Sequence, residues 1–233
     1  MKIFLLGDIH GEWEHADQSY ENATAKWGSP DLLIQVGDFG YYPTGVGYKV
    51  WHRNDFGHRC VFIDGNHEMH EALRAVEGKI DGCWEYARRG WHESGMLGIG
   101  GATSVDKAFR LKVGAHWSDL EDLTREEVDP ILDANYEDVK VVISHTCPSG
   151  FDMAWACNPM WGGEHKDEIT RVLLQEVLEK YKPEVWVFGH WHVSGSGTYH
   201  HEDGTTTEWQ CLDIAQMAKL ELSDDVLNLR IEV

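Results

Sequence analysis

The sequence predicts an α/β protein, a two-sheet α/β/β/α sandwich formed by a single domain over residues 1–233. Three observations support this prediction. Short apolar runs alternate with polar segments of helical length, and these runs end in or near Gly, Asp, Asn or His. A hairpin pattern follows toward the carboxyl end. The chain contains no internal repeat, low-complexity tract or linker that would divide it.

Five apolar runs are expected to be buried strands, because each has the length of a strand and is bounded by polar or turn-forming residues. They are Lys2–Leu6, Asp31–Val36, Cys60–Ile63, Lys140–Ile143 and Val185–Phe188.

The segments between these runs are polar and compatible with helices. Three helices are expected, at Glu12–Trp27, Glu68–Glu77 and Asp167–Tyr181. Thr124 and Glu127 have the spacing of a capping box, which predicts the start of a further helix.

The carboxyl end predicts strands of a second sheet. Residues Gly197–Gln210 contain the hairpin signal Asp203-Gly204 and are rich in Thr, Tyr and His. In the last seven residues apolar and polar side chains alternate, as in a half-buried strand: Leu227, Leu229, Ile231 and Val233 are the apolar members. A second sheet packed against the first is therefore the expected architecture.

Composition bounds the partners and the compartment. The net charge is −20, from 40 acidic and 20 basic residues, which favours a small substrate and argues against a nucleic-acid partner. No apolar stretch approaches the roughly 20 residues of a membrane helix, so no membrane partner is expected. The amino-terminal apolar run is also too short for a signal peptide. Five scattered cysteines without a Cys-x-x-Cys pair indicate a reducing compartment, and we predict the cytoplasm.

Candidate ligand motifs follow the predicted strands. Asp, His and Asn side chains offer oxygen and imidazole ligands that suit Mn, Fe, Zn, Co or Ni better than Ca or Mg. The carboxyl ends of strands in an open α/β sheet meet at one edge, which is where such side chains can converge. The motifs are Gly7-Asp8-Ile9-His10-Gly11, Gly37-Asp38, Asp64-Gly65-Asn66-His67-Glu68, Ser144-His145 and Gly189-His190-Trp191-His192.

In this order the motifs resemble those of the calcineurin-like metallophosphoesterase superfamily, over residues 3–192. The resemblance implies a two-sheet sandwich and two divalent transition-metal ions, for which we favour manganese, with Fe, Zn, Ni or Co as alternatives. It implies two ligand sets that share Asp38. One consists of Asp8, His10, Asp38 and His192, and the other of Asp38, Asn66, His145 and His190.

The resemblance also implies a mechanism. Two neighbouring cations would clamp the phosphate and supply a bridging hydroxide that attacks phosphorus in line. His67, next to the ligand Asn66, would face the substrate, stabilise charge on the phosphoryl oxygens and protonate the leaving oxygen. Asp38 and His67 are thus the predicted catalytic residues, and Asn66 and His67 are expected to contact substrate.

The sequence departs from the Ser/Thr protein phosphatases of this superfamily after the second motif. Those enzymes continue with Asp-Arg-Gly, whereas this chain has Tyr41-Tyr42-Pro43. The missing arginine would grip a phosphomonoester dianion, and the missing aspartate would orient His67. A diester carries one charge less, so we predict a phosphodiesterase acting on small nucleotide-like substrates, cyclic or linear.

Two further segments are candidate walls of the site. The segment from Gly100 to Arg110 is glycine-led and follows an apolar run, so Arg110 or Lys107 could supply the missing phosphate ligand. Its alternative interpretation is a surface turn. The loop from Phe151 to Gly163 could stack a nucleobase through Trp155 or Trp161, with Met160 beside them, or could be an ordinary packed lid.

Other functions remain open alternatives from the sequence. A phosphomonoesterase or nucleotide pyrophosphatase would use the same site. A nuclease is disfavoured by the acidic charge, and a non-catalytic scaffold is disfavoured because every ligand and His67 are present. The sequence determines neither the oligomeric state nor the physiological substrate.

Overall fold

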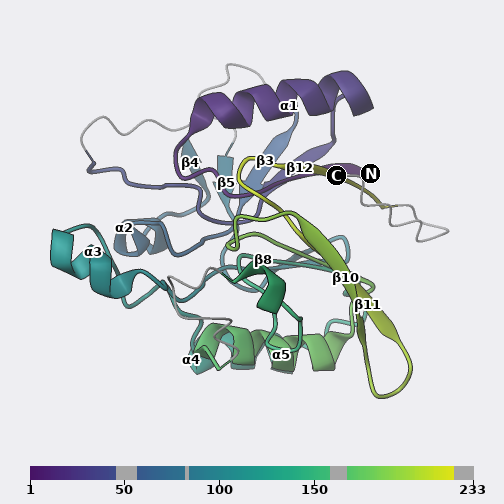
Figure 1. Ribbon diagram of the computed structural model, residues 1–233. Coiled ribbons are helices and arrows are strands. Elements are labelled where there is room, and N and C mark those ends of the chain that lie inside the picture. The colour runs from purple at the N-terminus through teal and green to yellow at the C-terminus, as the bar shows by residue number, and fades with distance from the viewer. Residues whose placement is uncertain (46–56, 82–83, 158–166, 223–233) are drawn as a thin grey trace.

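A computed structural model describes residues 1–45, 57–81, 84–157 and 167–222. In these ranges two six-stranded mixed sheets pack face to face, with helices on both outer sides (Figure 1). This arrangement confirms the predicted α/β/β/α sandwich. No helix in the described ranges is long and apolar enough to span a bilayer.

The first sheet has the strand order β12-β1-β2-β3-β5-β4. Its four central strands are parallel, and the edge strands β12 and β4 are antiparallel to their neighbours. The strands are β1 (Lys2–Leu6), β2 (Leu32–Gln35), β3 (Arg59–Phe62), β4 (Lys79–Asp81), β5 (Trp84–Tyr86) and β12 (Met217–Glu221).

The second sheet has the order β10-β11-β9-β8-β7-β6. It repeats the plan of the first, with parallel central strands and antiparallel edge strands β10 and β6. The strands are β6 (Trp91–Glu93), β7 (Met96–Ile99), β8 (Val141–Ser144), β9 (Val185–Phe188), β10 (Gly195–His200) and β11 (Thr206–Cys211).

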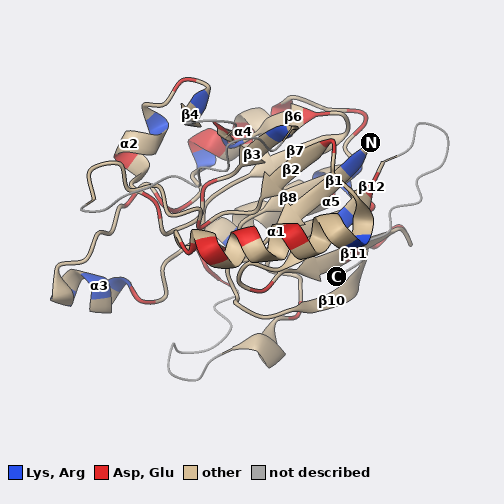
Figure 2. Cartoon of the chain, turned by 90° about the horizontal axis from the view of Figure 1, so that it is seen from above, with Lys and Arg blue, Asp and Glu red and all other residues tan. Residues whose placement is uncertain are grey.

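Helices cover the outer faces of both sheets. Helix α1 (Trp13–Trp27) lies along the first sheet, and α4 (Arg125–Asp133) and α5 (Ile169–Tyr181) lie along the second (Figure 1). The short helix α3 (Lys107–Val113) projects from the layers and carries basic residues (Figure 2). The remaining short elements are α2 (His70–Arg74) and the 3-10 turn η1 (Ala154–Ala156).

Alternation along the central strands builds the core. In β1, Ile3 and Leu5 face the space between the two sheets, whereas Phe4 and Leu6 face the layer that contains α1. This follows from the two-residue period of a strand. Because both faces are covered, β1 needs apolar residues at successive positions, and four of its five residues are buried.

The five predicted strands are confirmed, with bounds that differ by at most one residue at each end. The hairpin is confirmed as β10 and β11, with Gly204 at a φ of 86° in the connection. The capping box is also confirmed, since the Glu127 carboxylate accepts the backbone N–H of Thr124 at 3.0 Å.

Other expectations differ from the structure. The helix expected over Glu68–Glu77 is shorter, because the Glu68 carboxylate binds another loop and Gly78 adopts a φ of 82°. Helix α3 begins within the segment from Gly100 to Arg110, for which the sequence had suggested either a loop of the site or a surface turn. Strand β12 and the short strands β4, β5 and β6 were not predicted. The alternating segment from Leu227 to Val233 lies outside the described residues.

Arg89 illustrates how one buried charge is held. Its guanidinium donates to the Asp64 carboxylate at 2.7 and 3.1 Å, and the Asp64 side chain is 1% exposed. We expect Arg89→Met to lower the free energy of unfolding by about 3–5 kcal/mol, since it leaves a buried carboxylate without its cation. Urea denaturation measures this.

Arg59→Met is the matched control. Arg59 also pairs with two carboxylates, those of Glu85 and Glu93, but its side chain is 36% exposed. An exposed pair contributes about 0–1 kcal/mol, so the control should remain close to wild type. Equal losses for the two variants would contradict the role assigned to Arg89.

Candidate metal centre

The predicted ligands lie in the loops that follow five parallel strands. Because the two sheets present these strand ends on one side, residues from distant parts of the sequence meet there. Strand β1 leads to Asp8 and His10, β2 to Asp38, β3 to Asn66, β8 to His145, and β9 to His190 and His192.

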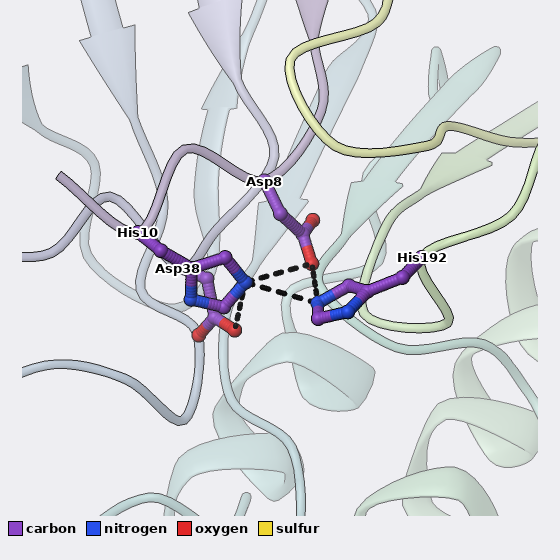
Figure 3. Close-up of side chains that lie close together, drawn as sticks. All are labelled: Asp8, His10, Asp38 and His192. Atoms are coloured by element: carbon purple, nitrogen blue, oxygen red, sulfur yellow. Dashed lines mark hydrogen bonds and ion pairs between the residues drawn. The ribbon is translucent and has the colours of Figure 1, made fainter. Parts of the chain in front are cut away.

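Asp8, His10, Asp38 and His192 form a first group, with one ligand atom from each within 4.8 Å of the others (Figure 3). The Nε2 atoms of His10 and His192 are 2.9 Å apart. The Asp8 carboxylate lies 3.2 Å from His192 Nε2, and the Asp38 carboxylate lies 3.7 Å from His10 Nε2. We call these four residues the outer group, because His192 is exposed and His10 is partly exposed.

Asp38 also belongs to a second group with His145 and His190, whose ligand atoms again lie within 4.8 Å of one another. The amide oxygen of Asn66 is 3.2 Å from His145 Nε2, and the Asp38 carboxylate is 3.3 Å from the same nitrogen. We call Asp38, Asn66, His145 and His190 the inner group, because Asp38, Asn66 and His145 are buried.

The backbone is strained at these positions. His10, Asp38, His190 and His192 have φ angles of 51°, 55°, 69° and 51°. They are half of the eight non-glycine residues with positive φ in the described ranges. Such a conformation costs of order 1–3 kcal/mol per residue and persists where the surroundings impose it. Its concentration in the ligand loops shows that the fold holds these side chains toward one point.

Two motif glycines leave room for ligands. At Gly37 a Cβ atom would overlap the imidazole of His145, and the residue has a φ of 103°. At Gly65 a Cβ atom would overlap the Asp38 carboxylate. Glycine is therefore required here both for close approach and, at Gly37, for its backbone angle.

Hydrogen bonds from outside the two groups orient the candidate ligands. His145 Nδ1 donates to the carbonyl of Val36 at 3.0 Å, so Nε2 is the ring nitrogen that faces the inner group. The Asp8 carboxylate accepts the backbone N–H of His190 at 3.0 Å, and the Asp38 carboxylate accepts that of His67 at 2.7 Å. These bonds fix which atoms are presented to the centre.

Glu68 holds the loop that carries Asp38. Its buried carboxylate accepts the backbone N–H groups of Phe39, Gly40 and Tyr41 at 2.7, 3.1 and 2.6 Å. The sequence placed Glu68 at the start of a helix, and only its position next to His67 hinted at a role here.

The electrostatics suit cations. Burial by itself raises the pKa of Asp38, but the imidazoles of His145, His67 and His10 hold it well below its usual range. Against the effect of burial, Asp38 and Asp8 raise the pKa of His145 to about 9. Burial and the neighbouring His145 lower the pKa of His190. The negative charge of the buried carboxylates is thus balanced in part by protons on the neighbouring imidazoles, and a metal cation could take the place of those protons.

This donor set fits two divalent transition-metal ions. The Nε2 atoms of His10 and His192 lie 2.9 Å apart with carboxylate oxygens beside them, so a cation at this position would meet both imidazole and carboxylate donors. Imidazole and carboxylate donors suit Mn, Fe, Zn, Co and Ni. The shared Asp38 places the two groups side by side.

His67 and Arg110 lie together next to the inner group. The Arg110 guanidinium donates to His67 Nε2 and to the backbone carbonyl of Asn66, the latter at 3.2 Å, and its Nε pairs with Asp106 at 2.8 Å. Burial and this guanidinium lower the pKa of His67 to about 4, against the opposing effect of Asp38. In this arrangement His67 is neutral with its ring proton on Nδ1.

The other candidate residues lie as follows. The Lys107 ammonium lies 3.7 Å from the centre of the Trp117 ring, as in a cation–π contact. Trp155 is 54% exposed on η1, and its indole N–H donates to the carbonyl of Asp152 at 3.1 Å. Met160 and Trp161 lie outside the described residues.

Sequence reasoning missed Ser104 and Glu121, which are both buried. Ser104 accepts a hydrogen bond from the amide of Asn66, and Glu121 accepts one from Ser104. Ser104 lies in the segment from Gly100 to Arg110, which the sequence already marked as a candidate wall of the site, so its involvement could have been considered. Glu121 carries no signal in the sequence.

Comparisons with known proteins agree with this geometry. A model of the calcineurin-like phosphoesterase family matches residues 1–194. A search of curated proteins gives no match. One solved crystal structure has a TM-score of 0.55 at 15% identity, covering 99% of this chain and 98% of the other. Because its identity to this chain is below 25%, that likeness shows the fold alone.

Two further solved structures are similar at lower scores. A protein of Thermus thermophilus has a TM-score of 0.49 at 13% identity, covering 94% of this chain and 93% of the other. The phosphopantetheinyl hydrolase of Mycobacterium tuberculosis has a TM-score of 0.44 at 15% identity, covering 92% and 90%.

Proposed function

This chain belongs to the calcineurin-like phosphoesterase family, and we propose that it is a phosphodiesterase for small nucleotide-like substrates, cyclic or linear. As a family member it is a metal-dependent phosphoesterase. We propose that Asp8, His10, Asp38 and His192 hold one cation and that Asp38, Asn66, His145 and His190 hold the other. Manganese is the favoured metal.

One observation carries the proposal: two ligand groups share the Asp38 carboxylate. Two cations bound side by side would supply charge to stabilise the phosphoryl oxygens and a water of lowered pKa as the nucleophile. The chain contributes the positions of the ligands, which the strained loops and outer hydrogen bonds fix before substrate binds. Preorganised charge of this kind is worth more in a buried site than in water.

The diester preference rests on the charge around Arg110. The chain has Tyr41-Tyr42-Pro43 where related phosphatases carry an arginine, and Arg110 offers a guanidinium from α3 instead. That guanidinium is paired with Asp106 at 2.8 Å. Because the pair has little net charge, it suits a singly charged diester better than a doubly charged monoester.

His67 is the proposed general acid for the leaving oxygen. Without substrate its imidazole is neutral and faces Arg110. A bound phosphate ester would compete for the Arg110 donor and place negative charge beside the ring, which raises the pKa of the imidazole. His67 and Arg110 would then both contact the phosphoryl group, and Asn66 would lie next to them.

A phosphomonoesterase is a second candidate. The observation that favours it is the contact between Arg110 and His67, which puts a guanidinium beside the proposed phosphate position. The net charge of −20 favours a small substrate for either activity.

The diester proposal predicts a substrate preference. Metal-stripped protein reloaded with Mn should hydrolyse a generic aryl phosphodiester with higher kcat/KM than the matching monoester. Asp38→Asn should abolish turnover and lower bound metal, because the residue belongs to both groups. Kinetic assays and metal analysis measure these effects. Activity on the monoester alone would overturn the diester proposal, and wild-type protein without bound Mn would overturn the metal centre.

The general-acid role predicts a dependence on the leaving group. His67→Ala should lower kcat/KM about 10²–10⁴-fold for a diester with a poorly acidic alcohol, and far less for a nitrophenyl diester, whose leaving oxygen needs no proton. Metal content should be unchanged. A loss that is equal for both substrates would limit His67 to binding, and a loss of metal would make it a ligand.

The charge argument predicts that removing the carboxylate beside Arg110 changes the preference between monoester and diester. Asp106→Asn removes the carboxylate that neutralises Arg110, so kcat/KM for the monoester relative to the diester should rise several-fold. Asp129→Asn is the matched control, since Asp129 makes a similar i,i+4 pair with Arg125 in an exposed position. The idea fails if both variants keep the wild-type ratio.

A further inference from the structure

A chain of hydrogen bonds leads from Asn66 to a buried carboxylate. Asn66 Nδ2 donates to Ser104 Oγ at 3.0 Å, and Ser104 Oγ donates to Glu121 Oε2 at 2.6 Å. The backbone N–H of Ser104 donates to the other oxygen, Glu121 Oε1, at 2.8 Å. Ser104, Glu121 and Asn66 are 5%, 1% and 5% exposed, so water has little access to these groups.

Backbone hydrogen bonds between loops hold the series Asn66–Ser104–Glu121 in place. Ser104 and Glu121 lie on the connection between β7 and α4, and the backbone N–H of Ala102 donates to the carbonyl of Glu121 at 3.2 Å. The same connection is tied to the loop after β3, since Gly101 N–H donates to the Asp64 carbonyl at 2.8 Å. Glu121 is therefore fixed relative to Asn66 although it does not touch that residue.

The direction of the bonds is determined at Glu121. Both of its oxygens accept, as a carboxylate requires. The single hydroxyl hydrogen of Ser104 is thereby used, and only a lone pair of Ser104 Oγ remains for Asn66. A lone pair can face the NH₂ of an amide but not its oxygen. The amide oxygen of Asn66 must then point the other way, toward His145 Nε2 at 3.2 Å.

We propose that Glu121, acting through Ser104, is a positioning residue that selects which face of the Asn66 amide is presented to the inner group. This inference rests on the proposed function, because it takes Asn66 as a ligand of the second cation. A carbonyl oxygen can bind a cation, whereas an amide NH₂ cannot. Glu121 thus controls the affinity of the inner group without contacting it.

Replacing Glu121 by its isosteric amide tests whether the direction of these hydrogen bonds sets the orientation of Asn66. In Glu121→Gln the carbonyl oxygen still accepts the N–H of Ser104, so the NH₂ faces Ser104 Oγ and donates to it. The hydrogen of the Ser104 hydroxyl is thereby released and can donate toward Asn66, which favours the opposite face of the amide and competes with the orientation in which its oxygen faces the inner group. A change of one atom, with almost no change in shape, should therefore damage metal binding.

The experiment is a titration of the metal-stripped, full-length protein with Mn. Calorimetry and electron paramagnetic resonance of bound Mn monitor the titration. Outer-shell partners of metal ligands typically contribute about 10–100-fold in affinity. We expect Glu121→Gln and Ser104→Ala to weaken binding of the Mn ion in the inner group by about that factor and to leave the affinity of the outer group unchanged. Asp119→Asn, an exposed change on the same connection, should match wild type.

A double-mutant comparison separates orientation from general damage. In the Asn66→Asp background both terminal atoms are oxygens, so no orientation remains to be selected. Glu121→Gln should then no longer weaken the Mn ion of the inner group, and the Ser104 hydroxyl becomes free to donate to the new carboxylate. A merely structural role of Glu121 would instead produce the same loss in both backgrounds.

The outcomes distinguish the two proposals. If wild type binds two Mn ions and Glu121→Gln binds them equally well, the positioning role is overturned while the dinuclear centre stands. An equal loss in the wild-type and Asn66→Asp backgrounds also overturns it. A wild-type protein that binds no second Mn overturns the dinuclear centre itself, and this inference with it.

Discussion

The site depends on one electrostatic constraint: two buried carboxylates, Asp8 and Asp38, must be held among imidazoles in a place that water hardly reaches. Burying charged groups without partners is costly, so the surrounding structure supplies hydrogen bonds to each of them. The backbone N–H of His190 serves Asp8, and that of His67 serves Asp38. The strained loops are a consequence, because ordinary backbone angles would not bring these groups together.

The sandwich provides the rigidity that this constraint requires. Apolar side chains fill the space between the sheets, and α1, α4 and α5 seal the outer faces. The strands are therefore fixed along their length, and the freedom of the chain is concentrated in the loops at their ends. Five of those loops face one another, so small residues such as Gly37 and Gly65 decide how closely the ligands approach.

Much of the fold could be predicted because its signals are local. The strand Lys2–Leu6 is an apolar run with a polar stop, and Thr124 with Glu127 forms a cap readable from spacing alone. The candidate motifs could be found because each follows a strand, and the choice of seven ligands among their residues came from the resemblance to a known family. The short strand β4 carries little apolar pattern, and α3 has only Arg110 buried, so neither gives a clear period. The link from Glu121 to Asn66 depends only on tertiary structure, and no sequence motif or residue spacing indicates it.

The unequal exposure of the two groups has a kinetic consequence. The His192 side chain is 44% exposed and that of His10 is 22% exposed, whereas His145 and Asp38 are at 0% and 1%. Solvent can compete for the ligands of the outer group far more easily than for those of the inner one. If the two proposed ions are bound, the one in the outer group should exchange rapidly with the medium, and the one in the inner group should be retained for longer.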